Sequence, residues 1–277
     1  MARRSNAAAT SQELQWRNDT QPDTNFVTAL ARGLSILRVF SSEDRYLGNR
    51  ELSERTGIPR PTISRLTQTL TGLGYLRYAE QLGKYQLGPG VLALGYRYLA
   101  STGLRDVARP HMQALADASD CAIALGSPDR ECMTYLEVCH GTGPLILRID
   151  VGARVPMAET AMGRAYLAAL PAARRATILD YLRSLQPKDW SKTQKAVERA
   201  VREYEEFGFC LSEGAWNRDV SAVGVPLVLE GGSHVMAFNC GGASLRLSRR
   251  ILKENLGPRL VDLVSQVERE VTGFDAV

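Results

Sequence analysis

The stretch GNRELSERTGIPRPTISRLTQTLTG, residues 48–72, predicts two short helices around a tight break. Gly57 supplies the break, because glycine readily adopts a positive φ. Pro59 and Pro61 suit the start of the second helix, where a missing N–H group costs little. We therefore predict a helix-turn-helix whose recognition helix covers residues 60–71.

The second helix has one apolar face and one polar face. Ile63, Leu66 and Leu70 recur at i, i+3 and i+7, so they are expected to be buried together. The opposite face carries hydroxyl, amide and guanidinium groups, which suit phosphates and base edges in a DNA major groove. The predicted DNA contacts on the two helices are Arg50, Arg60, Thr62, Ser64, Arg65, Gln68 and Thr69. The alternative is an ordinary helical corner with a solvated polar face.

Two short β-type runs follow in YLRYAEQLGKYQLG, residues 75–88, on either side of a polar turn at Gly83. They predict a hairpin of the kind called a wing, in which Arg77 and Lys84 are expected to reach flanking phosphates. A helix, a turn, a second helix and then a wing form a more specific order than the turn alone. This order favours a DNA-binding domain over a simple corner.

The distribution of charge supports a DNA partner. The chain of 277 residues has a net charge of only +4, but residues 1–100 carry 13 Lys and Arg against 8 Asp and Glu. Residues 101–277 carry 21 against 22. The basic excess therefore lies in the part that contains the helix-turn-helix, as phosphate binding requires. The length suffices for two compact domains.

Cysteine usage and hydropathy indicate a cytoplasmic protein. The five cysteines are scattered and include no C-x-x-C pair, so reduced thiols are expected rather than disulfides or structural zinc. No apolar run reaches the about 18 residues of a transmembrane helix. The segment 1–12 also lacks the apolar core of a secretory signal. We expect no membrane, no metal and no cofactor.

The segments around the helix-turn-helix complete its domain. Residues 1–25 are polar and small, and are predicted to be a mobile arm. Its Arg3 and Arg4 are expected to be solvated, with DNA contact as the alternative. Residues 26–41 predict an amphipathic helix that would form the floor under the other two. Its expected buried face consists of Val27, Leu30, Leu34 and Leu37. The DNA-binding domain is thus predicted over residues 26–88.

A connector is predicted over residues 89–103. Its helical part, about residues 89–101, is too apolar for an isolated linker, and the packing of two copies against each other would explain the excess. The alternative is a helix docked on its own domain. The sequence is compatible with both arrangements.

From residue 104 to 277 the pattern mixes helices and strands. Helices are expected over residues 104–119, 161–170, 172–185, 191–207 and 248–272. Strands are expected over 121–127, 132–139, 145–151, 209–214, 220–229 and 233–240, with a bend at 152–156. Antiparallel hairpins with segregated helices are typical of an α+β domain.

Seven stretches, taken in order, are similar to segments of one known family. They are ALARGLSILRVF (29–40), ELSERTGIPRPTISRLTQTLTGLGYL (51–76), LGPGVLALG (87–95), LRDVARPHMQALAD (104–117), RVPMAETAMGRAYLAALP (154–171), EEFGFCLSEG (205–214) and VGVPL (223–227). Together they resemble the IclR family of bacterial transcriptional regulators, over about residues 26–272. The resemblance implies a GAF-like effector domain, a homodimer or dimer of dimers, and operator DNA binding modulated by a small carboxylic acid or aromatic metabolite.

The resemblance also implies which residues bind the effector. They are Thr160, Ala161, Met162, Gly163, Ser212, Trp216, Val220, Ala222, Asn239 and Gly241. Free N–H groups at the helix start near residue 161 would favour an anion, and Glu159 is expected to complement the helix dipole.

This chain departs from the family in two places. It keeps only Glu213 where members carry several acidic residues, and it has Trp216, a pocket wall or a core residue, where a smaller side chain is usual. Farther on, Ala243 replaces a proline, and Asn239 offers an amide where members offer a hydroxyl. These departures leave the identity of the effector undetermined, but they do not change the predicted fold.

Two other functions compete with a regulator. A ligand sensor without DNA binding is disfavoured by the basic side chains expected on the exposed face. An enzyme would use Cys139, next to His140, or Cys240 as nucleophile. A thiol nucleophile needs a base within hydrogen-bond reach, and neighbours on a strand face opposite sides. We therefore predict no catalysis.

Overall fold

The computed structural model divides into two compact units, with the boundary just before Gly103. It describes residues 26–41, 43–101, 103–142, 149–188 and 190–274. The predicted arm over residues 1–25, with Arg3 and Arg4, lies outside the described residues.

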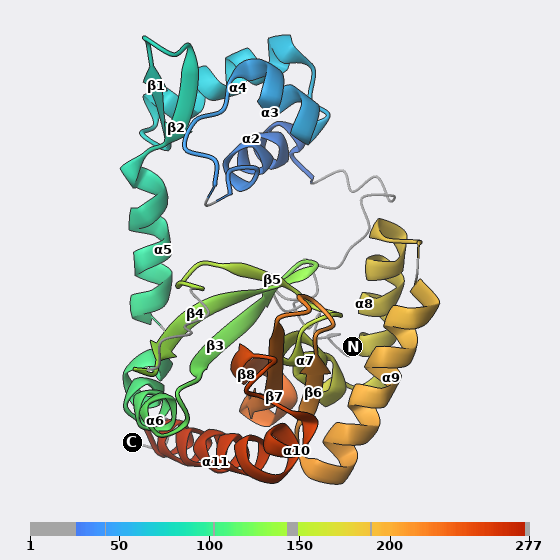
Figure 1. Cartoon of the computed structure of the whole chain (residues 1–277). Helices are drawn as coiled ribbons and strands as arrows, with labels where there is room; N and C mark the ends of the chain where they lie inside the picture. The colour runs from blue at the N-terminus through green and yellow to red at the C-terminus, as the bar shows by residue number, and fades with distance from the viewer. Residues whose placement is uncertain (1–25, 42, 102, 143–148, 189, 275–277) are drawn as a thin grey trace, which may run out of the picture. The chain divides into compact units, whose positions relative to one another are not determined.

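The N-terminal unit is a winged helix-turn-helix (Figure 1). Its elements are α2 (Thr28–Arg38), α3 (Asn49–Thr56), α4 (Arg60–Gly72), β1 (Leu76–Ala79), β2 (Lys84–Leu87) and α5 (Pro89–Ser101). The two strands pair in antiparallel register, Leu76 opposite Leu87. Leu47 adds an isolated bridge to Tyr85, which joins the segment before α3 to the wing. The predicted order of elements is confirmed.

The buried face of α2 differs from the prediction. Val27, Leu30 and Leu34 are 61%, 63% and 51% exposed, whereas the buried residues of this helix are Gly33 and Ile36. Of the four predicted residues, only Leu37 packs half-buried against the core of the unit. The helix carries apolar residues on more than one side, and periodicity alone selected the wrong side for Val27, Leu30 and Leu34. Ile36 enters the core of the unit, so α2 still supports the helix-turn-helix, but through a different face.

The core of this unit is a single apolar cluster. It contains Ile36, Leu47, Leu52, Ile58, Ile63, Leu70 and Leu76. Of the stripe predicted on α4, Ile63 and Leu70 are buried, while Leu66 is half-buried. Thr67 takes the remaining buried position, and its hydroxyl donates to the Ile63 carbonyl at 2.9 Å. That bond satisfies the hydroxyl inside the core.

Helix α5 starts from a close backbone contact with the segment between α4 and β1. The Gly88 N–H donates to the Tyr75 carbonyl at 2.8 Å, and a Cβ at Gly88 would lie 2.3 Å from the Gly74 oxygen. Only glycine fits this approach. Beyond its start, α5 has no buried residue. Its exposed apolar side chains include Leu92, Leu94, Tyr96 and Tyr98.

The C-terminal unit is built on an antiparallel sheet in the order β5-β4-β3-β8-β7-β6. The strands are β3 (Ala122–Asp129), β4 (Cys132–His140), β5 (Arg154–Pro156), β6 (Cys210–Glu213), β7 (Val220–Leu229) and β8 (His234–Ala243). Of the strand predicted over 145–151, residues 145–148 lie outside the described residues and 149–151 are not a strand. The strand at this edge of the sheet is β5 instead, which lies within the bend predicted at 152–156. The chain turns at Asp150, and Arg154 then pairs with Thr134 of β4.

Helices cover both faces of this sheet (Figure 1). They are α6 (Leu104–Ser119), α7 (Ala161–Ala169), α8 (Ala172–Leu185), α9 (Trp190–Phe207), α10 (Arg249–Ile251) and α11 (Gly257–Phe274). Helices α6 and α11 pack together against one face, while α7 packs on the other with α9 behind it. The last predicted helix is interrupted by a π-helical segment, Leu252–Leu256, where Gly257 packs onto the Phe209 ring.

Candidate DNA-binding and effector-binding sites

The polar face of α4 is open to solvent, as predicted. Five of the predicted contact residues, Arg60, Ser64, Arg65, Gln68 and Thr69, are exposed, and Thr62 is half-buried. Among the described residues, no acidic side chain pairs with Arg60 or Arg65. The Thr69 hydroxyl donates to the Arg65 carbonyl at 3.1 Å, so it is left to act as an acceptor.

The geometry of α4 relative to α3 is set by the turn between them. Gly57 has a φ of 69°, and its N–H donates to the Ser53 carbonyl at 2.9 Å. The Ser53 hydroxyl in turn donates to the Ile58 carbonyl at 2.7 Å. Pro59 then provides the carbonyl that accepts from the first turn of α4. These bonds hold the two helices at one angle, so the exposed face of α4 projects from a rigid base.

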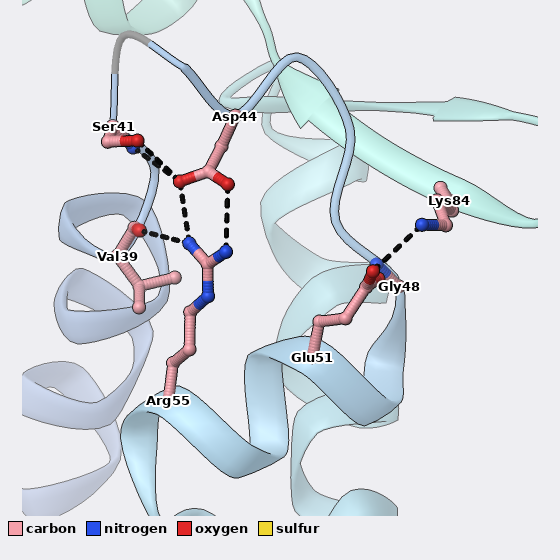
Figure 2. A network of polar contacts seen from close by, with 7 residues as sticks. All are labelled: Val39, Ser41, Asp44, Gly48, Glu51, Arg55 and Lys84. Carbon is pink, nitrogen blue, oxygen red and sulfur yellow. Dashed lines mark hydrogen bonds and ion pairs between the residues drawn. The ribbon is translucent and has the colours of Figure 1, made fainter.

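An ion pair ties the segment before α3 to that helix (Figure 2). The Arg55 guanidinium donates to both Asp44 oxygens, at 2.6 and 2.8 Å. Asp44 also accepts from the Ser41 N–H at 3.1 Å and from its hydroxyl at 2.6 Å. Arg55, followed by Ser41, holds the pKa of Asp44 well below its usual range. The Asp44 carboxylate therefore fixes the loop between α2 and α3 to Arg55 of α3.

A second carboxylate joins α3 to the wing (Figure 2). Glu51 accepts from the Gly48 N–H at 2.5 Å and from Lys84 Nζ at 2.8 Å. Lys84, followed by the Gly48 N–H, lowers the pKa of Glu51. In the free protein Lys84 thus pairs within the unit, and its phosphate contact stays a prediction. Arg77, exposed on β1 opposite Gln86, has no acidic partner among the described residues.

Arg50 differs from the other predicted cations. Its Nε donates to Glu54 at 2.7 Å across one turn of α3. Both side chains are well exposed, so the pair contributes little to stability. The carboxylate does, however, offset the positive charge that Arg50 would offer a phosphate.

The sheet brings several predicted effector residues onto one face. Ser212 lies opposite Ala222, which lies opposite Gly241 on the next strand. Asn239 is two residues from Gly241 on β8 and therefore points to the same side. This is the face on which α7 packs, because a Cβ at Gly224, the partner of Asn239, would meet the Ala161 carbonyl at 2.3 Å. We call it the α7 face.

The start of α7 is tightly packed. Thr160 is the N-cap, and its hydroxyl accepts from the Gly163 N–H at 3.3 Å while donating to the Pro156 carbonyl at 2.8 Å. A Cβ at Gly163 would lie 2.0 Å from the Met157 carbonyl. Ala161 and Met162 are fully buried. This first turn forms part of the packing against β7, and anion binding at it stays a prediction.

The remaining predicted residues lie toward the edge of the sheet. Trp216 is 38% exposed in the bend between β6 and β7, so the alternative that it belongs to the core is wrong. Val220 is half-buried at the start of β7. The Ser212 hydroxyl donates to the Glu159 carbonyl at 3.0 Å. Glu213 pairs with Arg249, so its charge is compensated within the chain.

Tyr135 is a residue of the α7 face that sequence reasoning missed. The Asn239 Nδ2 donates to its hydroxyl at 3.4 Å, and burial raises the pKa of Tyr135 to about 12. A β-bulge on β4 turns Tyr135 to this face: Leu125 pairs with Glu137, yet Gly126 pairs with Tyr135. Regular alternation along β4 would place Tyr135 and Glu137 on the same side of the sheet. The sequence therefore does not reveal that Tyr135 faces α7.

The opposite face holds a buried carboxylate and the two thiols, Cys139 and Cys240, that an enzyme would use as nucleophile. Glu137, with a side chain 3% exposed, accepts from Arg105 and Arg109 of α6, both at 2.7 Å. Cys139 and Cys240 are also buried. Burial raises the pKa of Cys139, and the hydrogen bond that the Cys240 thiol donates to Cys121, together with burial, raises the pKa of Cys240. Neither thiol is activated as a nucleophile would need.

Two negative findings concern only the described part of the chain. Its His, Cys, Asp and Glu residues form no group of three or more placed to hold a metal ion. None of its helices is both long and apolar enough to cross a bilayer.

A winged helix-turn-helix followed by an α+β unit is the architecture of a ligand-responsive DNA-binding regulator. The model of the IclR helix-turn-helix domain matches residues 29–80, and that of the bacterial transcriptional regulator IclR C-terminal domain matches residues 96–269. The chain belongs to the IclR family. It is a transcriptional regulator with a DNA-binding helix-turn-helix and a C-terminal effector-binding domain.

Individual relatives agree with this assignment. The HTH-type transcriptional regulator TsaQ1/TsaQ2 of Comamonas testosteroni is 36% identical over 250 residues, 90% of each chain. An IclR family transcriptional regulator from Brucella abortus, solved by crystallography, is 44% identical with a TM-score of 0.84, covering 92% of this chain and 96% of its own. An IclR homologue from Microbacterium hydrocarbonoxydans, solved with 4-hydroxybenzoate, is 19% identical with a TM-score of 0.69, over 88% and 99% of the two chains, and shares the fold.

Proposed function

We propose that this protein binds a palindromic operator through α4 and the wing, and that a small carboxylic or aromatic acid on the α7 face modulates the binding. The observation that carries the DNA contact is the open face of α4, where Arg60 and Arg65 have no acidic partner among the described residues. Arginine binds guanine edges or phosphates with paired donors. Arg77 adds a cation on the wing.

The protein is proposed to act as a symmetric dimer or a dimer of dimers. Apolar side chains are exposed on α2, at Val27, Leu30 and Leu34, and on α5, at Leu92 and Tyr96. Exposed apolar surface of this extent marks an interaction site, and a two-fold dimer presents two recognition helices to a palindrome. Light scattering of the full chain is expected to give at least a dimer.

Effector binding is proposed to act by population shift. A ligand that binds one arrangement of the effector domains more tightly favours that arrangement, and α5 transmits the change to the spacing of the recognition helices. An effector with equal affinity for the free and the DNA-bound protein would have no such effect. The protein is proposed to be cytoplasmic and to carry out no catalysis, as its relatives are regulators.

A gel shift on the intergenic DNA beside the protein's own gene tests the function. A specific shift is expected in the presence of excess nonspecific competitor. If no shift occurs at any salt concentration, with or without small acids, the protein is a ligand sensor that does not bind DNA.

A further inference from the structure

Two thiols meet on the face of the sheet opposite to the α7 face. Cys240 of β8 pairs with Ile123 of β3. Cys121 directly precedes β3, so alternation places its side chain on the same face as that of Ile123. Cys121 and Cys240 are therefore diagonal neighbours, which are close enough for side chains to meet. The Cys240 thiol donates a hydrogen bond to the Cys121 sulfur.

The turn between β8 and α10 covers Cys121. A Cβ at Gly242 would lie 3.8 Å from the Cys121 Sγ and 3.3 Å from the Leu247 Cδ1, so both side chains lie beside this glycine. Arg246 of the turn pairs at 3.5 Å with Asp120, the residue before Cys121. Both of these charged side chains are exposed, and such pairs contribute little to stability. Local opening of this turn gives a small molecule access to Cys121.

The contact between the thiols makes them chemically unequal. The hydrogen bond from Cys240, joined by Ser119 and the nearby Arg246, lowers the pKa of Cys121 to about 7. The same contact, together with burial, raises the pKa of Cys240. Thiol oxidation begins at a thiolate, and a redox-sensitive thiolate has a second thiol beside it that completes a disulfide. Cys121 suits the first role and Cys240 the second.

The other three cysteines are not arranged in this way in the described part of the chain. Burial raises the pKa of Cys132, Cys139 and Cys210. Cys139 lies on the same face of the sheet as the pair, but its thiol donates to the Arg109 carbonyl at 3.8 Å. Cys139 is therefore a buried thiol with which the pair can be compared.

We propose that Cys121 and Cys240 form a reversible disulfide when the protein meets a hydroperoxide. The Cys121 thiolate attacks the O–O bond and keeps one oxygen as a sulfenic acid, while the other oxygen leaves with a proton as water or an alcohol. The Cys240 thiol then attacks the Cys121 sulfur, and the sulfenic hydroxyl leaves with the thiol proton as water. Two thiols are oxidised and one peroxide is reduced. The inference is independent of the ligand bound on the α7 face.

The position of the pair favours a disulfide that is easily reduced. A bond between diagonal neighbours requires a small backbone movement, and a strained disulfide is more reducible. Gly241 and Gly242 follow Cys240, and glycine gives this end of β8 the conformational freedom to move. Because Cys121 comes just after α6, which ends at Ser119, the bond would tie the end of that helix to β8.

The test is treatment of the reduced full-length protein with hydrogen peroxide, followed by alkylation of the remaining thiols in denaturant and peptide mass spectrometry. Two of the five thiols are expected to be lost. The peptides that contain Cys121 and Cys240 are expected to be cross-linked within one chain. Dithiothreitol should restore all five thiols. This map is made on the wild type, so it does not depend on the folding of any variant.

Cys240→Ala separates the two chemical steps. Without the second thiol, Cys121 is expected to remain a sulfenic acid that dimedone traps, whereas the reduced wild type treated in the same way should pass on to the disulfide. Cys121→Ala is expected to give no dimedone adduct at Cys240. Cys139→Ala is the matched control, because this thiol is buried on the same face. It should leave the cross-link between Cys121 and Cys240 intact.

Three results would overturn the inference. Five free thiols in the folded protein, at a peroxide concentration that oxidises the urea-unfolded protein, would show that the pair is inaccessible. A cross-link through other cysteines, or between two chains, would place the reactive thiol elsewhere. Absence of a dimedone adduct at Cys121 in Cys240→Ala would show that Cys121 is not the thiol that attacks the peroxide.

Discussion

Lys84 Nζ lies 2.8 Å from Glu51 Oε1, so the wing is held to α3 by the lysine that was expected to contact phosphate. Both side chains are 39% exposed, and an ion pair in that setting contributes no more than about 1 kcal/mol. Its importance is therefore for DNA binding rather than for stability. A phosphate near the wing would compete with Glu51 for the lysine.

Glu51→Gln is expected to strengthen operator binding a few-fold at low salt, because it frees Lys84 and removes a negative charge. The gain should shrink as salt rises. Gel-shift titrations over a range of salt measure it, with Lys84→Ala as the background for a double-mutant cycle. An equal gain in that background would mean that the freed lysine takes no part.

Arg65→Ala is expected to weaken operator binding by about 1–3 kcal/mol if Arg65 reads a base. Arg50→Ala should cost less, because Glu54 already offsets that charge. Arg183→Ala, at an exposed position of α8 in the other unit, serves as the control for charge alone. Titrations at one fixed salt concentration compare the three. No change for Arg65→Ala would show that the assigned face is wrong.

Asp44 predicts a pH dependence of stability. The pKa of Asp44 is lowered in the folded state, chiefly by Arg55. Its ionised form therefore adds to the free energy of unfolding at pH values above the pKa of the unfolded state, which is about 4. That contribution is lost as the pH falls toward the folded pKa. Thermal unfolding of Asp44→Asn and wild type is expected to differ most at neutral pH and to converge below about pH 4. A difference that does not vary with pH would show that the ionised form is not what stabilises the loop.

The Glu137 cluster predicts unequal costs for its two sides. Replacing Arg105 and Arg109 together by Met leaves a buried carboxylate unpaired, which should lower the free energy of unfolding by about 3–5 kcal/mol. Glu137→Gln leaves two arginines that water already reaches, so its cost should be about 1–2 kcal/mol. Denaturant unfolding measures both. Equal losses would show that the carboxylate is hydrated when unpaired.

Gly163→Ala tests the packing of α7. The added Cβ would meet the Met157 carbonyl at 2.0 Å, so a loss of about 1–3 kcal/mol in the free energy of unfolding is expected. Gly33→Ala is the matched control, since nothing lies within 4 Å of its Cβ position on α2. It should gain about 0.5–1 kcal/mol from helix propensity. Both follow from thermal melts.

The recognition helix and its exposed face could be predicted because their signals are local. Gly57 marks the break, and Ile63 and Leu70 mark the buried side of α4 within two turns of helix. Such patterns depend on neighbouring residues alone. The strands β7 and β8 likewise follow from runs bounded by turn residues. The resemblance to the IclR family then implied how these helices and strands assemble into two domains.

The sequence by itself thus determined the order of elements, the polar face of α4 and the class of protein. Tertiary packing decided which side of α2 is buried, because Leu30 and Ile36 are equally plausible core residues until a partner is chosen. It also decided that Lys84 meets Glu51, across 33 positions of sequence. The bulge that turns Tyr135 toward Asn239 is a third case. One extra residue in a strand reverses the facing of all that follow, and only strand pairing reveals it.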